Sequence, residues 1–437
     1  MRRTRAALLA AVLLAAAAVA ACPSLLAAQE EDSTWLDHAR AADIAYRAGA
    51  FSTDRAQLLA VRRLIGANPD VDYGLAVAEA RLGDPGLAVQ WLATWAAMGL
   101  WRDIARDADL VSLHGTRQWP GILARVAASR VPVARGAPRF TLPDPDMLAE
   151  DLAWDSATNR YFVSSVRRGV VLVVDSAGAA RPFTAPGGAG VWAMMALGVD
   201  AARGVLWATT AALPGGARYA RADSGRSALL AYDLATGAPR ARLEPPPNTG
   251  AHALGDLVVA PDGTVYVSDA DGGAVYAAAP NAIALRVLVP PGELVSPQTP
   301  ALSPDGRRLF VADYARGVAA VDLATGEVRW LPHPGNVAII GIDGMYRAGR
   351  DLIVVQNGVT PNRVVRLVLD SAMTRVLGAE LLERGTPPLA DPTHGVVRGA
   401  AFDVIANSGW ARVRDDGTMA PGTDADRVVI RRIPLGP

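Results

Sequence analysis

The sequence predicts a mainly β protein, a six-bladed β-propeller with an all-α segment before it. Three observations lead to this fold class. Over its second two thirds, the 437-residue chain repeats a unit of roughly 45 residues six times. It also contains 42 glycines and 31 prolines, which suits a fold with many short turns. Residues 33–131 instead show an apolar period of about 3.6, which is typical of helices. We therefore expect a helical domain at 33–131 and a propeller at 138–437, with a proline-containing linker between them.

The six units share one pattern of strands and turns. Each holds a short apolar strand, a turn that is often Pro-Asp-Gly, and a second apolar strand. A third strand often ends in a common tag, as in Tyr232-Asp-Leu-Ala-Thr-Gly and Val321-Asp-Leu-Ala-Thr-Gly. Several short strands at a regular spacing are typical of propeller blades. The units start at Leu152, Leu197, Leu257, Pro300, Met345 and Val397, at intervals of 45, 60, 43, 45 and 52 residues. Residues 427–434 and 138–142 are expected to supply the strands that close the ring.

Residues 33–131 indicate a stack of short helices. Asp84 followed by Pro85 is a helix start, because Asp caps the first turn and Pro is tolerated at the first helical position. Gly83 ends the preceding helix, and the small Ala78 and Ala88 would let the two helices pack closely. This hairpin resembles a tetratricopeptide repeat. The resemblance leaves two alternatives, a binding surface for a protein partner or a helical cap, and we favour the cap because two or three repeats give a small concave surface.

The N-terminus has the pattern of an export signal over residues 1–28. Three arginines precede an uncharged run rich in Ala, Leu and Val at residues 6–21. The stretch Val19-Ala20-Ala21-Cys22 resembles the lipobox of bacterial lipoproteins, which implies lipidation of Cys22 and an anchor in the inner or outer membrane. Ordinary cleavage near Ala28 is the alternative and would discard Cys22. Either way, we expect an exported protein of the periplasm or cell envelope.

Composition excludes several function classes. The 43 basic and 43 acidic side chains balance, so the chain lacks the positive charge that nucleic-acid binding needs. All the basic residues are arginine, which excludes Schiff-base lysines and a phosphate-loop lysine. The single cysteine can form neither an internal disulfide nor a Cys/His zinc site. A small-molecule substrate and hard-cation chemistry remain open.

The repeat alignment points to a channel mouth. Propeller blades arrange their innermost strands around a central channel, so the position two residues before each unit start should converge at one opening. Two carboxylates and one amide occupy these positions, and such oxygen ligands suit Ca²⁺, Mg²⁺ or Mn²⁺. His394 directly precedes the last position, and it lies either in a loop or at the mouth. The six positions are Glu150, Met195, Gly255, Gln298, Asp343 and Gly395.

At these positions the chain resembles the gluconolactonase/regucalcin-like family of six-bladed propellers. The resemblance covers about residues 145–410. It implies a divalent cation at the mouth (Ca²⁺, Mg²⁺, Mn²⁺ or Zn²⁺) that polarises a lactone or ester carbonyl and activates water. The phrases that carry it are Glu150-Asp-Leu-Ala-Trp-Asp, Leu302-Ser-Pro-Asp-Gly-Arg-Arg-Leu-Phe-Val-Ala-Asp and Ile342-Asp-Gly-Met.

The same resemblance assigns roles to individual residues. It implies Glu150, Gln298 and Asp343 as metal ligands, with Asp343 also the general base. The family has Asn where Gln298 stands, and a second Asn where Gly255 stands. Further residues are predicted to line the mouth and touch the substrate: Asp256, His252 and Trp192.

Two functions from different classes follow. The first is an exported metal-dependent hydrolase of the lactone or ester type, favoured by Glu150 and Asp343 at equivalent blade positions. The alternative is a non-catalytic repeat-plus-propeller binding protein of the cell envelope, favoured by Gly255, Gln298 and the fused helices.

Overall fold

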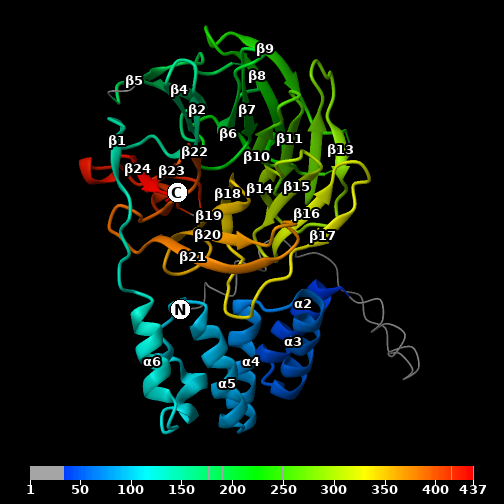
Figure 1. The fold of residues 1–437 in the computed structure, drawn as a ribbon, viewed down its shortest axis with the longest axis vertical. Coiled ribbons are helices and arrows are strands. Elements are labelled where there is room, and N and C mark those ends of the chain that lie inside the picture. Colours follow the sequence, from blue (N-terminus) through cyan, green and yellow to red (C-terminus); the bar gives the residue numbers. More distant parts are fainter. Residues whose placement is uncertain (1–33, 176–177, 189, 248–249, 415, 437) are drawn as a thin grey trace. The chain divides into compact units, whose positions relative to one another are not determined.

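The computed structural model describes residues 34–436 except 176–177, 189, 248–249 and 415. The predicted signal peptide and Cys22 lie outside the described residues. The chain forms two compact units (Figure 1), the first reaching Ser129 and including His333–Ala338, the second comprising Arg130–Pro332 and Ile339–Pro437. No helix in the described part of the chain has the length and apolar character that crossing a membrane requires.

The first unit is helical, as predicted. The Asp84 side chain accepts a hydrogen bond from the Leu87 N–H at 2.9 Å, so it caps the helix that begins at Pro85. Gly83 ends the preceding helix in the left-handed conformation that glycine adopts readily. Ala78 and Ala88 are fully buried. The α-helices are α2 (Trp35–Arg47), α3 (Phe51–Ile65), α4 (Pro69–Leu82), α5 (Pro85–Ala97) and α6 (Trp119–Ala128), with the 3₁₀ turns η1 (Ile104–Arg106) and η2 (Ala108–Leu113).

The second unit contains six four-stranded antiparallel sheets, which confirms the predicted six blades. Blade 1 is β2 (Ala149–Asp155), β3 (Arg160–Ser165), β4 (Val170–Val174) and β5 (Ala180–Pro182). Blade 2 is β6 (Ala193–Asp200), β7 (Val205–Ala211), β8 (Ser227–Asp233) and β9 (Pro239–Leu243). Blade 3 is β10 (Leu254–Val259), β11 (Val265–Asp269), β12 (Ala274–Ala278) and β13 (Arg286–Val289).

The remaining blades follow the same order from the inside outwards. Blade 4 is β14 (Pro297–Leu302), β15 (Arg308–Asp313), β16 (Gly317–Asp322) and β17 (Val328–Trp330). Blade 5 is β18 (Ile342–Ala348), β19 (Asp351–Gln356), β20 (Arg363–Leu369) and β21 (Val376–Arg384). Blade 6 is β22 (Gly395–Arg398), β23 (Ala401–Ile405), β24 (Val429–Pro434) and β1 (Ala137–Thr141). Short 3₁₀ turns are η3 (Arg221–Asp223), η4 (Trp410–Arg412) and η5 (Asp424–Asp426).

Both ends of the propeller sequence close the ring. In blade 6, β1 pairs antiparallel with β24, so the first strand of the propeller completes the sheet built by the last three. Apolar side chains then fill the space between neighbouring blades. One such cluster joins Trp207 of β7 to Tyr276 of β12, and both are buried. The ring therefore needs no disulfide, in agreement with the single cysteine.

The shared tag forms the turn between the third and fourth strands of a blade. Asp322 Oδ1 accepts hydrogen bonds from the N–H groups of Ala324 and Thr325, both at 3.0 Å. Asp233 bonds its own turn in the same way. These Asx-type turns explain why two distant segments share the same five residues, Asp-Leu-Ala-Thr-Gly.

Candidate functional site

The inner strands bring six distant segments to one end of the channel. β2, β6, β10, β14, β18 and β22 contact one another in ring order. In five of them the register with the second strand slips at the position predicted to face the mouth. Such bulges re-aim side chains, so neighbouring residues share the channel. The slips lie at Ala149/Leu152, Met194/Leu197, Leu254/Asp256, Pro297/Pro300 and Ile342/Gly344.

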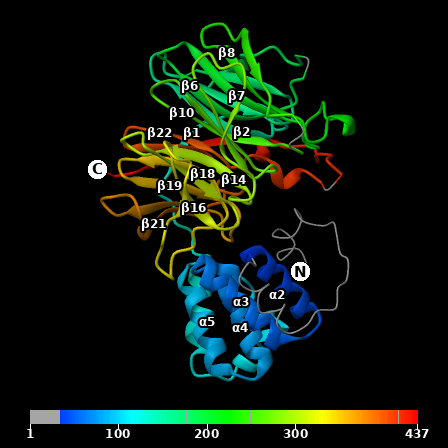
Figure 2. The same ribbon diagram turned by 90° about the vertical axis from the view of Figure 1, so that its right-hand side faces the viewer.

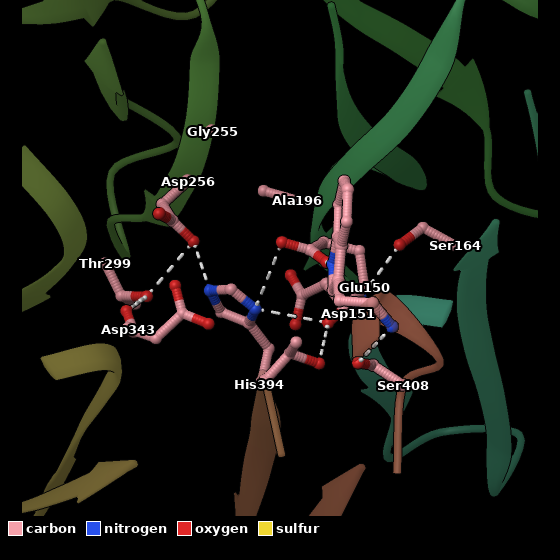
Figure 3. A network of polar contacts seen from close by, with 12 residues as sticks. Glu150, Asp151, Ser164, Ala196, Gly255, Asp256, Thr299, Asp343, His394 and Ser408 are labelled. Atoms are coloured by element: carbon pink, nitrogen blue, oxygen red, sulfur yellow. Dashed lines mark hydrogen bonds and ion pairs between the residues drawn. The ribbon is translucent and has the colours of Figure 1, made fainter. Parts of the chain in front are cut away.

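Glu150, Asp343 and His394 meet at this mouth. Each offers one ligand atom, and these three atoms lie within 4.8 Å of one another (Figure 3). They come from blades 1, 5 and 6. Glu150 and His394 are 6% and 2% exposed, while Asp343 is partly buried. Two carboxylate oxygens and one imidazole nitrogen at this spacing form a donor set that fits a divalent cation.

His394 lies at the centre of the group. Its Nδ1 is 3.1 Å from the Glu150 carbonyl oxygen, and its Nε2 is 2.5 Å from Asp256 Oδ1. This close contact is an ion pair when the imidazole is protonated, which the raised pKa of His394 favours. A ring whose Nδ1–H donates to a backbone carbonyl directs Nε2 into the site, which is how metal-binding histidines are usually held. The buried nitrogen therefore suits either a cation or a second proton.

Burial dominates the electrostatics of the carboxylates at the mouth. Burial raises the pKa of Glu150 to about 8, although nearby His394 opposes this shift. Burial also raises the pKa of Asp343, and the Asp256 carboxylate adds to that effect. For His394, burial lowers the pKa, but Asp256 and Asp343 outweigh it and raise the pKa well above its usual value. A divalent cation bound between these side chains would lower the pKa of all three.

Neighbouring side chains hold the two acids in place. The Trp410 indole N–H donates to Glu150 Oε2 at 2.5 Å. The Asn357 amide donates to Asp343 Oδ2 at 2.6 Å, and the Tyr314 hydroxyl donates to Asn357 Oδ1 at 3.0 Å. In each acid, the oxygen that accepts this bond is fixed, which leaves the other oxygen to face the group at the centre.

Two further residues form hydrogen bonds between blades at the mouth. The Thr299 hydroxyl lies 3.1 Å from Asp256 Oδ1 and 2.8 Å from the Asp343 carbonyl oxygen, so it links blades 3, 4 and 5. Asp151 Oδ2 accepts from the Leu197 N–H of blade 2 at 2.7 Å. Burial raises the pKa of Asp151 to about 6. These contacts position the acids and make the mouth rigid.

The other predicted site residues lie as follows. Asp256 joins the group through His394. Gln298 turns its amide nitrogen to Ser296, 3.0 Å from Oγ and 3.3 Å from the carbonyl oxygen, so its role as a ligand stays a prediction. His252 is buried, with Nδ1 2.5 Å from Asp269 Oδ2.

Trp192 is also buried, and it lies beside two cations. The guanidinium groups of Arg226 and Arg242 lie 5.0 and 5.4 Å from its ring centroid. These cation–π contacts occupy the ring with the protein's own arginines. Substrate contact by His252 and Trp192 therefore stays a prediction.

Sequence reasoning missed several residues of the mouth. Thr299 and Asp151 each directly follow a predicted position. The bulges in β14 and β2 direct their side chains to the mouth. Asn357 and Tyr314 lie in the short turns that follow the second strands of blades 5 and 4. Trp410 lies in the long connection between β23 and β24, whose length was the signal that could have found it.

Comparison with known proteins places the chain among β-propellers. The sequence profile of the PQQ_2 family, described as outer membrane protein assembly factor BamB, matches residues 93–332, more than half of the chain. No curated protein matches the chain in sequence.

Two solved structures are similar to this chain at low identity. The PQQ-bound aldose sugar dehydrogenase from Streptomyces coelicolor is 14% identical with a TM-score of 0.46, over 69% of this chain and 99% of its own. A gluconolactonase from Xanthomonas campestris is 16% identical with a TM-score of 0.43, over 70% of this chain and 100% of its own. At such low identity these similarities assign no function.

Proposed function

The chain belongs to the PQQ_2 family, described as outer membrane protein assembly factor BamB, and within it we propose a metal-dependent hydrolase that opens lactones or related esters. One observation carries the proposal: Glu150, Asp343 and His394, from three separate blades, present ligand atoms within 4.8 Å of one another. Buried acids with raised pKa values are unfavourable without a counter-charge. Their presence at the mouth of a channel supports a functional role.

The types of ligand atom limit which cation the site would bind. Glu150, Asp343 and the Nε2 of His394 would be the ligands, in place of the sequence-based set that included Gln298. The imidazole nitrogen favours Zn²⁺ over Ca²⁺ or Mg²⁺, which take oxygen donors, and the two carboxylates also suit Mn²⁺. When bound, such an ion polarises a carbonyl and lowers the pKa of water.

The protein's own side chains would supply the general base and hold the ligands in place. Asp343 is proposed as the general base, because Asn357 fixes one of its oxygens and leaves the other toward the site. Trp410 fixes Glu150 in the same manner. In the metal-free protein His394 Nε2 and Asp256 form a buried ion pair, and the cation would replace the proton on that nitrogen. Glu150 and His394 are almost fully buried, which keeps bulk water away from these two side chains.

The test is metal content together with lactone turnover. The protein purified without chelator should carry about one equivalent of Zn²⁺ or Mn²⁺ and hydrolyse lactones, and chelation should abolish turnover until metal is restored. Glu150→Gln removes one ligand at nearly constant volume, so it should lose both metal and turnover. Asp322→Asn, in a turn at the other end of a blade, is the matched control and should keep both. Metal content that is unchanged in Glu150→Gln would overturn the proposal.

A second function is favoured by the family match itself. The family is described as an outer membrane assembly factor, and a helical unit precedes the propeller, which supports a non-catalytic binding protein of the cell envelope. In that case the predicted leader and Cys22 would place the protein outside the cytoplasm. Cell fractionation of the full-length chain, compared with Cys22→Ser, tests the location. Full retention of a protein partner by Glu150→Gln, with no lactone turnover in the unaltered protein, would favour this alternative.

A further inference from the structure

Two blades carry long connections at the channel mouth. The turn between the second and third strands spans residues 212–226 in blade 2 and 406–428 in blade 6. The corresponding turns in the other blades are 166–169, 270–273, 314–316 and 357–362. Figure 2 shows the two connections, green and red, projecting on the same side of the propeller. We call them the mouth insertions.

The mouth insertions touch each other. Gly417 has a φ of +79°, and a Cβ placed there would lie 2.7 Å from the Pro214 carbonyl oxygen. A Cβ at Gly215 would lie 3.6 Å from Trp410 Cζ3 and 3.8 Å from Val413 Cγ1. Only glycine allows the first approach without displacement of the backbone. The two insertions therefore meet as one roof.

This roof rests on an apolar floor. The residues on both sides form one cluster, the roof cluster, in which every side chain is apolar apart from the indole N–H of Trp410. Its buried members come from blades 1 and 2, and its partly buried members come from the insertions. They are Leu148, Val166, Ala193, Met195 and Ala211, with Leu213, Trp410, Val413 and Met419 packed against them.

The roof cluster adjoins the acids directly. The Trp410 N–H donates to Glu150 Oε2, so the roof ends where the carboxylates begin. On β6, Met195 and Ala196 occupy the bulge that Glu150 and Asp151 occupy on β2. The other inner strands place acids, a hydroxyl or an imidazole at the mouth. The site is thus polar over blade 1 and blades 3 to 6, and apolar over blade 2.

We infer that the substrate is a lactone or ester with an apolar chain, whose carbonyl faces Glu150, Asp343 and His394 while the chain lies against the roof cluster. This inference rests on the proposed function. Each methylene that leaves water is worth about fourfold in binding. A polyhydroxylated lactone would instead bury hydroxyls against side chains that offer them no partners.

The test compares three γ-lactones on the metal-loaded full-length protein: γ-decalactone, γ-butyrolactone and galactono-1,4-lactone. We expect kcat/KM for γ-decalactone to exceed that for each of the others by at least roughly 50-fold, as three or more buried methylenes require. Equal or faster turnover of γ-butyrolactone or galactono-1,4-lactone would overturn this inference and leave the proposed function standing. No turnover of any of the three would overturn the proposed function and this inference with it.

Two matched pairs of variants locate the chain. Val413→Asn introduces an amide into the roof cluster, whereas Ile283→Asn does so at a side chain that is 96% exposed. Gly417→Ala forces the insertions apart, whereas Gly399→Ala has a similar positive φ of +56° with nothing within 4 Å. The first member of each pair should lower the kcat/KM ratio of γ-decalactone to γ-butyrolactone about tenfold or more. The second members should leave this ratio unchanged. An unchanged preference in both Val413→Asn and Gly417→Ala would contradict the placement.

Discussion

Acidic residues at the two ends of the blades have opposite environments. Asp233 and Asp322 lie in exposed turns, where backbone N–H groups lower the pKa of both carboxyls, that of Asp233 to about 2. Glu150 and Asp343 lie at the mouth, where burial raises the pKa of both carboxyls. The turn acids are satisfied mostly within their own turns, and Arg240 adds a bond to Asp233. The mouth acids are buried close together and share one imidazole, that of His394, and this difference separates a structural acid from one available for chemistry.

The largest expected contrast comes from the same substitution at the two ends. Asp343→Asn should reduce lactone turnover by more than about 100-fold, because loss of a ligand exceeds the roughly 10- to 100-fold cost of losing an outer partner. It should also raise the melting temperature of the metal-free protein, since a buried charge is removed. Asp322→Asn should leave turnover intact and slightly lower the melting temperature. Steady-state kinetics and thermal unfolding of both variants check the contrast, and equal turnover in the two would break it.

A smaller effect is expected from the partner of Asp343. Asn357→Leu removes the amide that donates to Asp343 Oδ2 but keeps a similar volume. Turnover should fall about 10- to 100-fold, and the acid arm of the pH profile should move to higher pH, because the base loses a hydrogen bond that lowers its pKa. Tyr314→Phe, one step further out, should cost less. If Asn357→Leu lowers stability but leaves kcat and the pH profile unchanged, Asn357 is only structural.

The stability of the metal-free protein should depend on pH in opposite senses at the two ends. The folded pKa of Glu150, about 8, exceeds the usual 4.5, so its contribution is full below pH 4.5 and lost as pH rises towards 8. The raised pKa of His394 acts in the same direction. Asp233 acts oppositely, because its stabilisation is present above pH 3.8 and lost as pH falls towards 2. Thermal unfolding with a chelator should show the melting temperature falling by several degrees between pH 5 and 8. Glu150→Gln should flatten that slope, and an equal slope in the variant would count against the assignment.

The contrast also explains what sequence could and could not predict. The turn acids can be recognised from sequence, because Asp233 and Asp322 each begin the same five-residue segment. The six blades and the closing strands followed from that repetition, and the structure confirms them. Glu150 and Asp343 could be found because blade equivalence locates them even without local partners.

The rest of the mouth depends on backbone detail that the repeat does not reveal. Bulges in the inner strands bring Asp256 and Thr299 into the channel, one residue after the predicted Gly255 and Gln298. His394 arrives one residue before the predicted Gly395, and sequence left its position open. Trp410 comes from an insertion outside the repeat altogether. Periodicity thus fixes which strands converge, but the side chains that meet there follow from the register of each strand.

The most direct test of the central claim is anomalous diffraction from crystals of the full-length protein grown with Mn²⁺. The account predicts a single strong peak within ligand distance of Glu150, Asp343 and His394, and its absence in Glu150→Gln crystals. A mouth without a peak, with His394 Nε2 hydrogen-bonded to Asp256 as an imidazolium, would contradict the account.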